Sequence, residues 1–228
     1  MAKYTYVLFD ADETLLDFER AEREALTEAL TRFGIPCDEN VIELYSGINA
    51  SLWKKLERRE IEKSRLRVLR FELLRNALGF DSDTTAVAFA YTDSLSKQSF
   101  LLAGAIDICQ KLAEHCKLYI VTNGLKDVQR GRLGGSGLLP YFEGVFVSED
   151  VGFEKPDARY FEAVAERISG FNKKDAIIVG DSLSSDIKGG IGFGIDTCWF
   201  NPKGKEKPTD MNITYTVKNL SELEDIIL

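Results

Sequence analysis

The feature that most constrains the fold is a series of short apolar runs, the later ones separated by helical patterns. Most of these runs are continuous rather than alternating, which is typical of strands covered on both faces. The five runs are Tyr4–Phe9, Leu118–Thr122, Gly144–Val147, Ala176–Gly180 and Thr197–Phe200. Strand and helix in repetition predict an α/β fold, with a parallel five-stranded sheet and right-handed crossovers.

The interval between the first and second runs is anomalous, because a crossover needs one helix and several helical patterns fill it. The expected helices cover the apolar stripe Ala21–Phe33, then Glu39–Arg58, Ile61–Leu78 and a segment after Asp83. The extra helices indicate an inserted all-helical domain. We expect this domain over residues 17–96, and a core domain made of residues 1–16 and 97–228.

Two carboxylates follow the first apolar run, at Asp10 and Asp12. Ligands of open α/β sheets bind beyond the carboxyl ends of the strands. Side chains two residues apart in extended chain face the same side, so Asp10 can attack phosphorus while Asp12 donates and accepts a proton. The alternative for this segment alone is a polar turn after a strand.

A second acidic pair, Asp181 and Asp186, follows the fourth run. Helix capping explains Asp186, which is expected in the first turn of the next helix, but it does not explain an acid at the strand end. Four carboxylates at one sheet edge would repel one another. A hard divalent cation relieves that repulsion, and oxygen ligands favour Mg²⁺.

Two further segments offer donors to a phosphate. Thr122 and Asn123, in Thr-Asn-Gly, follow the second run and can present a hydroxyl and main-chain N–H groups. Lys155, before Pro156, follows the third run and can bridge nucleophile and phosphate. The alternative for each segment is an ordinary turn or loop, because Asn-Gly and Lys-Pro are common there.

The order of these four segments resembles the haloacid dehalogenase superfamily of phosphatases. The resemblance rests on DxDxT, Thr-Asn-Gly, Lys-Pro and GDxxxxD, and it covers nearly the whole chain. It implies a Rossmann-like core with an inserted helical cap of the C1 type. It also implies that Asp10 is the nucleophile and Asp12 the acid/base.

The same resemblance implies the ligand sets. Asp10, the Asp12 main-chain carbonyl and Asp181 would hold Mg²⁺, with Asp186 supporting the metal shell. Thr122 and Lys155 would bind phosphate. True haloacid dehalogenases lack an acid at the position of Asp12, because a halide leaves without a proton, so its presence favours a phosphatase.

A narrower resemblance is to the bacterial pyrimidine 5′-nucleotidase branch. It rests on DADETLLDF, GDSLSSDI and the cap segment Asn49–Trp53, with Arg70-Phe71 further on. The chain departs from that branch at Arg58-Arg59-Glu60, where a glycine is more usual. Trp53 can stack on a base and Asn49 can read its edge, while the alternative for large cap aromatics is packing.

The composition of the chain limits the classes of partner that the protein is expected to bind. The formal charge of −8 argues against a nucleic-acid polymer, although it allows a local site for an anionic small molecule. The four cysteines form no CxxC pair, and Cys109 and Cys116 are expected to be buried thiols, which favours the cytoplasm. The N-terminal residues suggest no signal peptide, and no apolar run is long enough for a membrane span. We expect a monomer or homodimer.

The sequence therefore predicts a Mg²⁺-dependent phosphate monoester hydrolase, acting on pyrimidine nucleoside monophosphates as a 5′-nucleotidase. The alternative is a phosphatase or phosphomutase for small sugar or organic-acid phosphates such as a phosphoglycolate-like compound. The third hypothesis is a haloacid dehalogenase.

Overall fold

The computed structural model describes residues 2–228, and the chain divides into two compact units. The core comprises Met1–Asp17 and Phe100–Leu228, and the cap comprises Phe18–Ser99. Both boundaries lie slightly later in the chain than residues 16 and 96. Main-chain pairing explains the difference, because the Asp17 N–H donates to the Phe100 carbonyl at 3.0 Å and keeps both connections with the core.

The core is built on one sheet in which all neighbouring strands run parallel, in the order β3-β2-β1-β4-β5-β6. The strands are β1 (Tyr6–Phe9), β2 (Lys117–Thr122), β3 (Gly144–Val147), β4 (Ala176–Gly180), β5 (Asp196–Phe200) and β6 (Tyr215–Val217). The apolar runs predict the first five and miss β6. That strand has three residues, of which one is buried, so it carries no periodic pattern.

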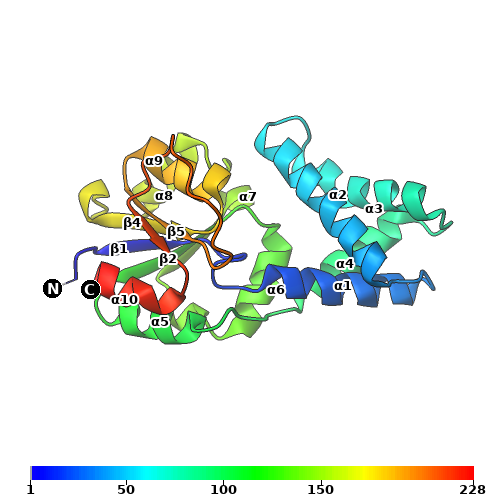
Figure 1. Cartoon of the computed structure of the whole chain (residues 1–228), viewed down its shortest axis with the longest axis horizontal. Coiled ribbons are helices and arrows are strands. Elements are labelled where there is room, and N and C mark those ends of the chain that lie inside the picture. Colours follow the sequence, from blue (N-terminus) through cyan, green and yellow to red (C-terminus); the bar gives the residue numbers. More distant parts are fainter. Residues whose placement is uncertain (1) are drawn as a thin grey trace. The chain divides into compact units, whose positions relative to one another are not determined.

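Helices cover both faces of this sheet (Figure 1). The core helices are α5 (Ala105–Ala113), α6 (Lys126–Ser136), α7 (Ser148–Val151), α8 (Ala158–Arg167), α9 (Lys188–Phe193) and α10 (Leu223–Ile227). Alternate residues of β1 point to opposite faces: Val7 and Phe9 pack in the cluster that includes residues of α5 and α10, and Tyr6 and Leu8 pack with α8. This two-sided burial explains why the strands read as continuous apolar runs.

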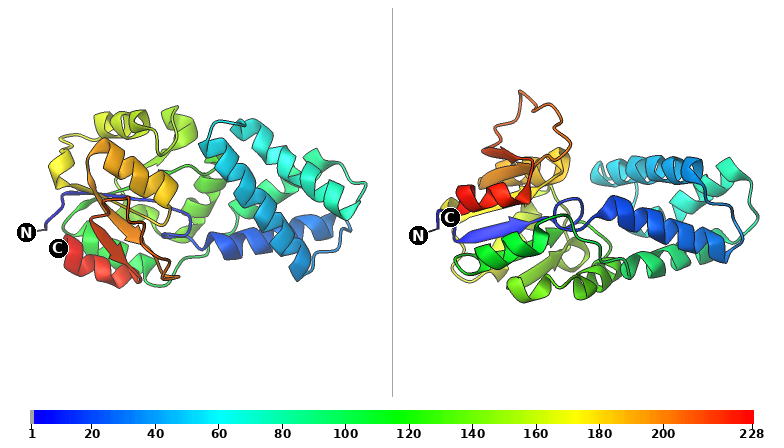
Figure 2. Two further views of the ribbon diagram at one scale, coloured as in Figure 1. Left: turned by 45° about the horizontal axis from the view of Figure 1, so that its top comes forward. Right: turned by 60° about the horizontal axis from the view of Figure 1, so that its bottom comes forward.

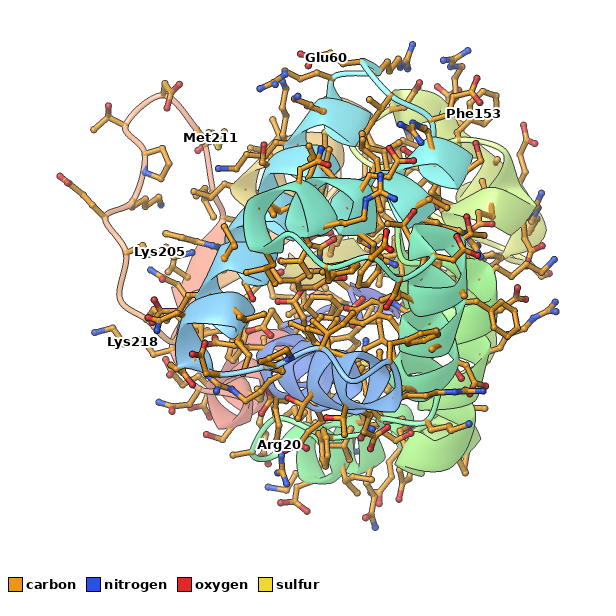
Figure 3. The ribbon with its side chains drawn as sticks, turned by 90° about the vertical axis from the view of Figure 1, so that its right-hand side faces the viewer. Arg20, Glu60, Phe153, Lys205, Met211 and Lys218 are labelled. Carbon is orange, nitrogen blue, oxygen red and sulfur yellow. The ribbon has the colours of Figure 1, made fainter. Side chains whose placement is uncertain are left out.

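The two ends of the chain meet at the amino end of the sheet. The Lys3 N–H donates to the Ile227 carbonyl at 2.8 Å, and Figure 1 shows α10 beside the start of the chain. The carboxyl ends of the strands therefore form the opposite edge. The segment between β5 and β6 is an open loop that carries Lys205 and Met211 (Figure 3).

The cap is a bundle of four helices (Figure 2). They are α1 (Phe18–Arg32), α2 (Glu39–Glu57), α3 (Lys63–Leu78) and α4 (Thr84–Ser96). Asp38 and Asp83 cap α2 and α4 by accepting main-chain N–H groups. Three aromatic rings from α2, α3 and α4, those of Tyr45, Phe71 and Tyr91, pack at centroid distances of 5.2–5.3 Å.

Other sequence expectations can be checked on the fold. Cys109 and Cys116 are buried free thiols, as their apolar context predicts. Among the described residues, no helix combines the length and apolar character needed to cross a membrane.

Candidate active site

Three carboxylates meet at the carboxyl ends of two neighbouring strands. Asp10 follows β1, and Asp181 and Asp186 follow β4, which pairs with β1. One oxygen of each carboxylate lies within 4.8 Å of those of the other two. Asp10 and Asp186 are buried and Asp181 is partly exposed. Residues separated by most of the core sequence thus form one acidic cluster, on the sheet edge where the sequence predicts it.

Main-chain contacts fix the first two members of this cluster. The Asp10 N–H donates to the Val179 carbonyl at 2.9 Å. The Asp181 N–H donates to the buried Thr14 hydroxyl at 3.1 Å, and the Asp181 carbonyl accepts from the Trp199 indole at 2.9 Å. Thr14 therefore ties the loop after β1 to the loop after β4.

Asp186 is set by a turn that the sequence does not reveal. It lies in a π-helical turn, Leu183–Ile187, directly before α9 rather than in the first turn of that helix. Its carboxylate accepts from the Ser182 N–H at 3.1 Å. A Cβ atom on Gly180 would lie 2.6 Å from the Asp186 Cβ, so the glycine at the end of β4 makes room for this carboxylate.

Lys155 is the cation at the centre of the cluster. It is 1% exposed, and its ammonium donates to Asp10 Oδ1 at 2.6 Å, Asp186 Oδ1 at 2.6 Å and the Val121 carbonyl at 2.7 Å. Burial lowers the pKa of Lys155, but attraction to Asp10 and Asp186 outweighs burial and leaves the pKa raised. Lys155 is therefore a fixed positive charge, and all three of its N–H groups have partners.

One ammonium does not balance three carboxylates. Burial and then repulsion from Asp186 raise the pKa of Asp10 well above its usual range, against the opposing effect of Lys155. Burial, Asp186 and Glu13 likewise raise the pKa of Asp181 to about 7. This uncompensated charge and the all-oxygen donor set fit a hard divalent cation such as Mg²⁺.

Asp12 does not join this cluster through its side chain. Its Oδ2 accepts from the Gln129 side-chain amide at 2.6 Å, and its Oδ1 forms an ion pair with Arg132. Gln129 and Arg132 are buried residues of α6 at 1% and 0% exposure. The sequence analysis did not single out either residue. Their spacing on one face of a helix after Thr-Asn-Gly is the only sequence signal, and it does not identify their partner.

Thr122 ends β2, and Asn123 follows it and contacts Lys155. The Thr122 hydroxyl oxygen accepts from the Gly124 N–H at 3.1 Å and from Gln129 at 2.9 Å, which leaves its own proton to act as a donor. Asn123 uses its side chain differently from a phosphate ligand. Its amide bonds both main-chain polar groups of Lys155, at 2.8 and 2.9 Å, and so holds the lysine in register.

The two cap residues singled out by sequence are both packed within the cap. Asn49 is 3% exposed, and its amide donates to Glu22 at 2.7 Å and accepts from Arg70 at 3.4 Å. Trp53 is partly buried against the cluster of Leu52, Leu56 and Leu66. Asn49 therefore serves a buried polar network of the cap, whereas Trp53 is only partly buried.

Comparison with known proteins gives one family. The family model described as haloacid dehalogenase-like hydrolase matches residues 4–194. Pyrimidine 5′-nucleotidase PynA of Streptococcus pneumoniae is 41% identical over 98% of this chain and 95% of its own length. Pyrimidine 5′-nucleotidase YjjG of Escherichia coli is 30% identical over 99% of this chain and 98% of its own length.

A solved structure agrees over the whole chain. The putative HAD-hydrolase YfnB of Bacillus subtilis, in a crystal form bound to magnesium, is 39% identical, and 98% of each chain superimposes with a TM-score of 0.93.

Proposed function

Because this chain belongs to the haloacid dehalogenase-like hydrolases, we propose that it is a Mg²⁺-dependent phosphatase acting through a phosphorylated Asp10. The observation that carries the proposal is the cluster of Asp10, Asp181 and Asp186 around Lys155, with Asp12 two residues from the nucleophile. Carboxylates arranged in this way can supply both the nucleophile and the ligands of a metal ion.

The proposed reaction has two steps, and Asp12 transfers a proton in each. First, an Asp10 carboxylate oxygen attacks phosphorus, the bond to the leaving oxygen breaks, and protonated Asp12 gives that oxygen its proton. Next, the Asp12 carboxylate takes a proton from water as the water oxygen attacks phosphorus. The bond to Asp10 then breaks, and phosphate leaves.

Thr122 and Lys155 are the proposed phosphate ligands. The Thr122 hydroxyl oxygen accepts from two donors, so its proton is left to donate to a phosphate oxygen. The Lys155 ammonium already contacts Asp10, so it can follow the negative charge from the carboxylate to the phosphoryl oxygens as the bond to phosphorus forms.

Asp10, the Asp12 carbonyl and Asp181 are the proposed Mg²⁺ ligands, with Asp186 behind them. When bound, Mg²⁺ supplies charge neutralisation and orientation of the phosphate. The role of Asp12 also separates phosphatase from dehalogenase, because an alkoxide leaving group needs a proton and a halide does not.

We propose pyrimidine nucleoside 5′-monophosphates as the preferred substrates. Two relatives that match over nearly the full chain are pyrimidine 5′-nucleotidases. The core residues above address only phosphate, metal and the reacting oxygen, so selection falls to the cap, with the partly buried Trp53 as base platform. Four free cysteines support a reducing, cytoplasmic setting.

A phosphate-release screen tests the proposal. The purified protein is assayed with nucleoside monophosphates and with sugar and organic-acid phosphates, with Mg²⁺ and with excess chelator. We expect Mg²⁺-dependent release, fastest from pyrimidine nucleotides. A preference for sugar phosphates over every nucleotide would overturn the nucleotidase assignment alone, and full turnover in chelator would overturn the metal assignment.

A further inference from the structure

We propose that Arg132 and Gln129 are positioning residues that orient the carboxyl group of Asp12 for proton transfer, and that Gly124 provides the space that this arrangement needs. The inference rests on the proposed phosphatase function and adds residues to which no role has been assigned above. It is carried by contacts within the core alone.

Arg132 supplies the first contact. It extends from α6 and is fully buried, and its guanidinium pairs with Asp12 Oδ1 across 120 residues of sequence. The Asp12 side chain keeps 27% of its surface exposed, so its carboxyl group remains accessible while Arg132 contacts it. A buried cation that contacts a partly open carboxylate fixes its direction more strongly than a surface pair does.

Gln129 supplies the second contact and connects two parts of the site. Its side-chain nitrogen donates to Asp12 Oδ2 at 2.6 Å and to the Thr122 hydroxyl at 2.9 Å. One amide group therefore sets the acid/base relative to a proposed phosphate ligand. With Arg132 on one oxygen and Gln129 on the other, both Asp12 oxygens are held.

Gly124 is required for this placement. A Cβ atom at position 124 would lie 2.7 Å from the Gln129 Cδ and 2.7 Å from its Cγ, closer than side chains approach. The glycine of Thr-Asn-Gly thus leaves open the space that the Gln129 side chain fills. Replacing Gly124 by alanine would displace Gln129 without touching Asp12 directly.

Positioning matters because Asp12 must meet two different oxygens, that of the leaving group and that of water. A misplacement of about 1 Å can cost about 10²-fold in rate. The leaving group of an activated aryl ester departs with little help from a proton, whereas the leaving oxygen of a nucleoside 5′-phosphate needs one. The loss of activity should therefore be larger on the nucleotide than on the aryl ester. A merely structural residue would not distinguish these two esters.

The experiment compares kcat/KM for a pyrimidine nucleotide with kcat/KM for nitrophenyl phosphate. This parameter reports the steps up to departure of the alcohol. The variants are Arg132→Met, Arg132→Lys, Gln129→Met and Gly124→Ala. The matched control is Arg130→Met, on the same helix but 65% exposed. We expect about 10- to 100-fold loss on the nucleotide for Arg132→Met, a much smaller loss on the aryl ester, and partial recovery with lysine.

A double-mutant cycle makes the test decisive. In an Asp12→Asn background, Arg132→Met should cost no further activity on the nucleotide, because the group it positions is gone. Equal losses on both esters, or an additive loss in the cycle, would overturn the inference. Arg132→Lys and Gly124→Ala keep the test valid if Arg132→Met fails to fold. A wild-type protein that releases phosphate from neither ester would instead refute the proposed function.

Discussion

At the scale of single residues, the site holds more carboxylates than cationic side chains to balance their charge. Lys155 uses all of its donors on Asp10, Asp186 and a carbonyl, and Arg132 is committed to Asp12. Asp181 has no such cation in direct contact among the ion pairs of the described residues, and burial raises its pKa to about 7. The proposed Mg²⁺ would supply the remaining positive charge beside Asp181, while Asp12, held by Arg132, would stay outside the metal shell through its side chain.

Asp12→Asn tests that separation. The variant should retain Mg²⁺ affinity, because the proposed contact of residue 12 with the metal is through its carbonyl. Its kcat/KM should fall about 10²–10⁴-fold for a nucleotide, since no proton reaches the leaving oxygen, and fall much less for nitrophenyl phosphate. Calorimetric Mg²⁺ titration and the two assays check this, and lost Mg²⁺ binding would place the Asp12 side chain in the metal shell instead.

How far the site can be predicted depends on which residues lie beside strand ends. Asp10 and Asp181 directly follow strands and Thr122 ends one, so the shared carboxyl edge of a parallel sheet places them together. Lys155 comes after β3 and the short helix α7. Arg132 lies inside a helix and meets Asp12 across 120 residues, a contact that no local pattern encodes. The roles assigned to all of these residues stay predictions.

At the scale of elements, long and buried segments are predictable and short or strained ones are not. The apolar pattern gives the strands β3 and β4 with the bounds that the structure has. The three-residue β6 escapes it. Gly131, Gly134 and Gly135 lie within α6, which ends at Ser136 and has Gly137 as its C-cap, with φ of 76°.

The turn between α2 and α3 carries a strained residue. Figure 3 labels Glu60 in this turn, and Arg59 beside it has a φ of 60°, in the left-handed region that favours glycine. Arg59→Gly should therefore stabilise the cap by about 0.5–1 kcal/mol, as relief of left-handed strain outweighs added chain freedom. Arg58→Gly, at a φ of −85°, is the control and should destabilise it. Denaturant unfolding measures both, and equal effects would contradict the strain.

Trp53 of α2 tests the proposed role of the cap. Stacking on a base is worth about 1–3 kcal/mol, so Trp53→Ala should lower kcat/KM for a pyrimidine nucleotide by about five- to a hundred-fold. Hydrolysis of a small aryl ester should hardly change. Since Trp53 also packs on Leu52 and Leu56, parallel losses on both substrates with a lower melting temperature would show a structural role.

At the scale of the whole molecule, the acidic cluster links stability to pH and to metal. Burial, followed by repulsion from Asp186, raises the pKa of Asp181 from 3.8, its usual value, to about 7 in the fold. Between these values the folded state binds more protons, so rising pH favours unfolding. The lowered pKa values of the exposed carboxyls of Glu39 and Glu72 oppose this trend only near their usual value of 4.5, because well above it these groups are ionised in both states.

We therefore expect the melting temperature of the metal-free protein to fall as pH rises toward about 7. The increase produced by Mg²⁺ should grow over the same range, because the ligands bind metal in their ionised form. Scanning calorimetry at several pH values, with and without Mg²⁺, measures both. Asp181→Asn is the matched control and should flatten the pH dependence of the Mg²⁺ effect. A Mg²⁺ effect that weakens as pH rises would contradict the proposed site.

The central claim is that phosphate passes through Asp10, and trapping the intermediate tests it most directly. Borohydride reduces an aspartyl phosphate to homoserine, so the protein is quenched with borohydride during turnover and its peptides are examined by mass spectrometry. We predict substrate-dependent homoserine at position 10 in the wild type and none in Asp10→Asn. Rapid phosphate release with homoserine at another aspartate, or at none, would contradict the account.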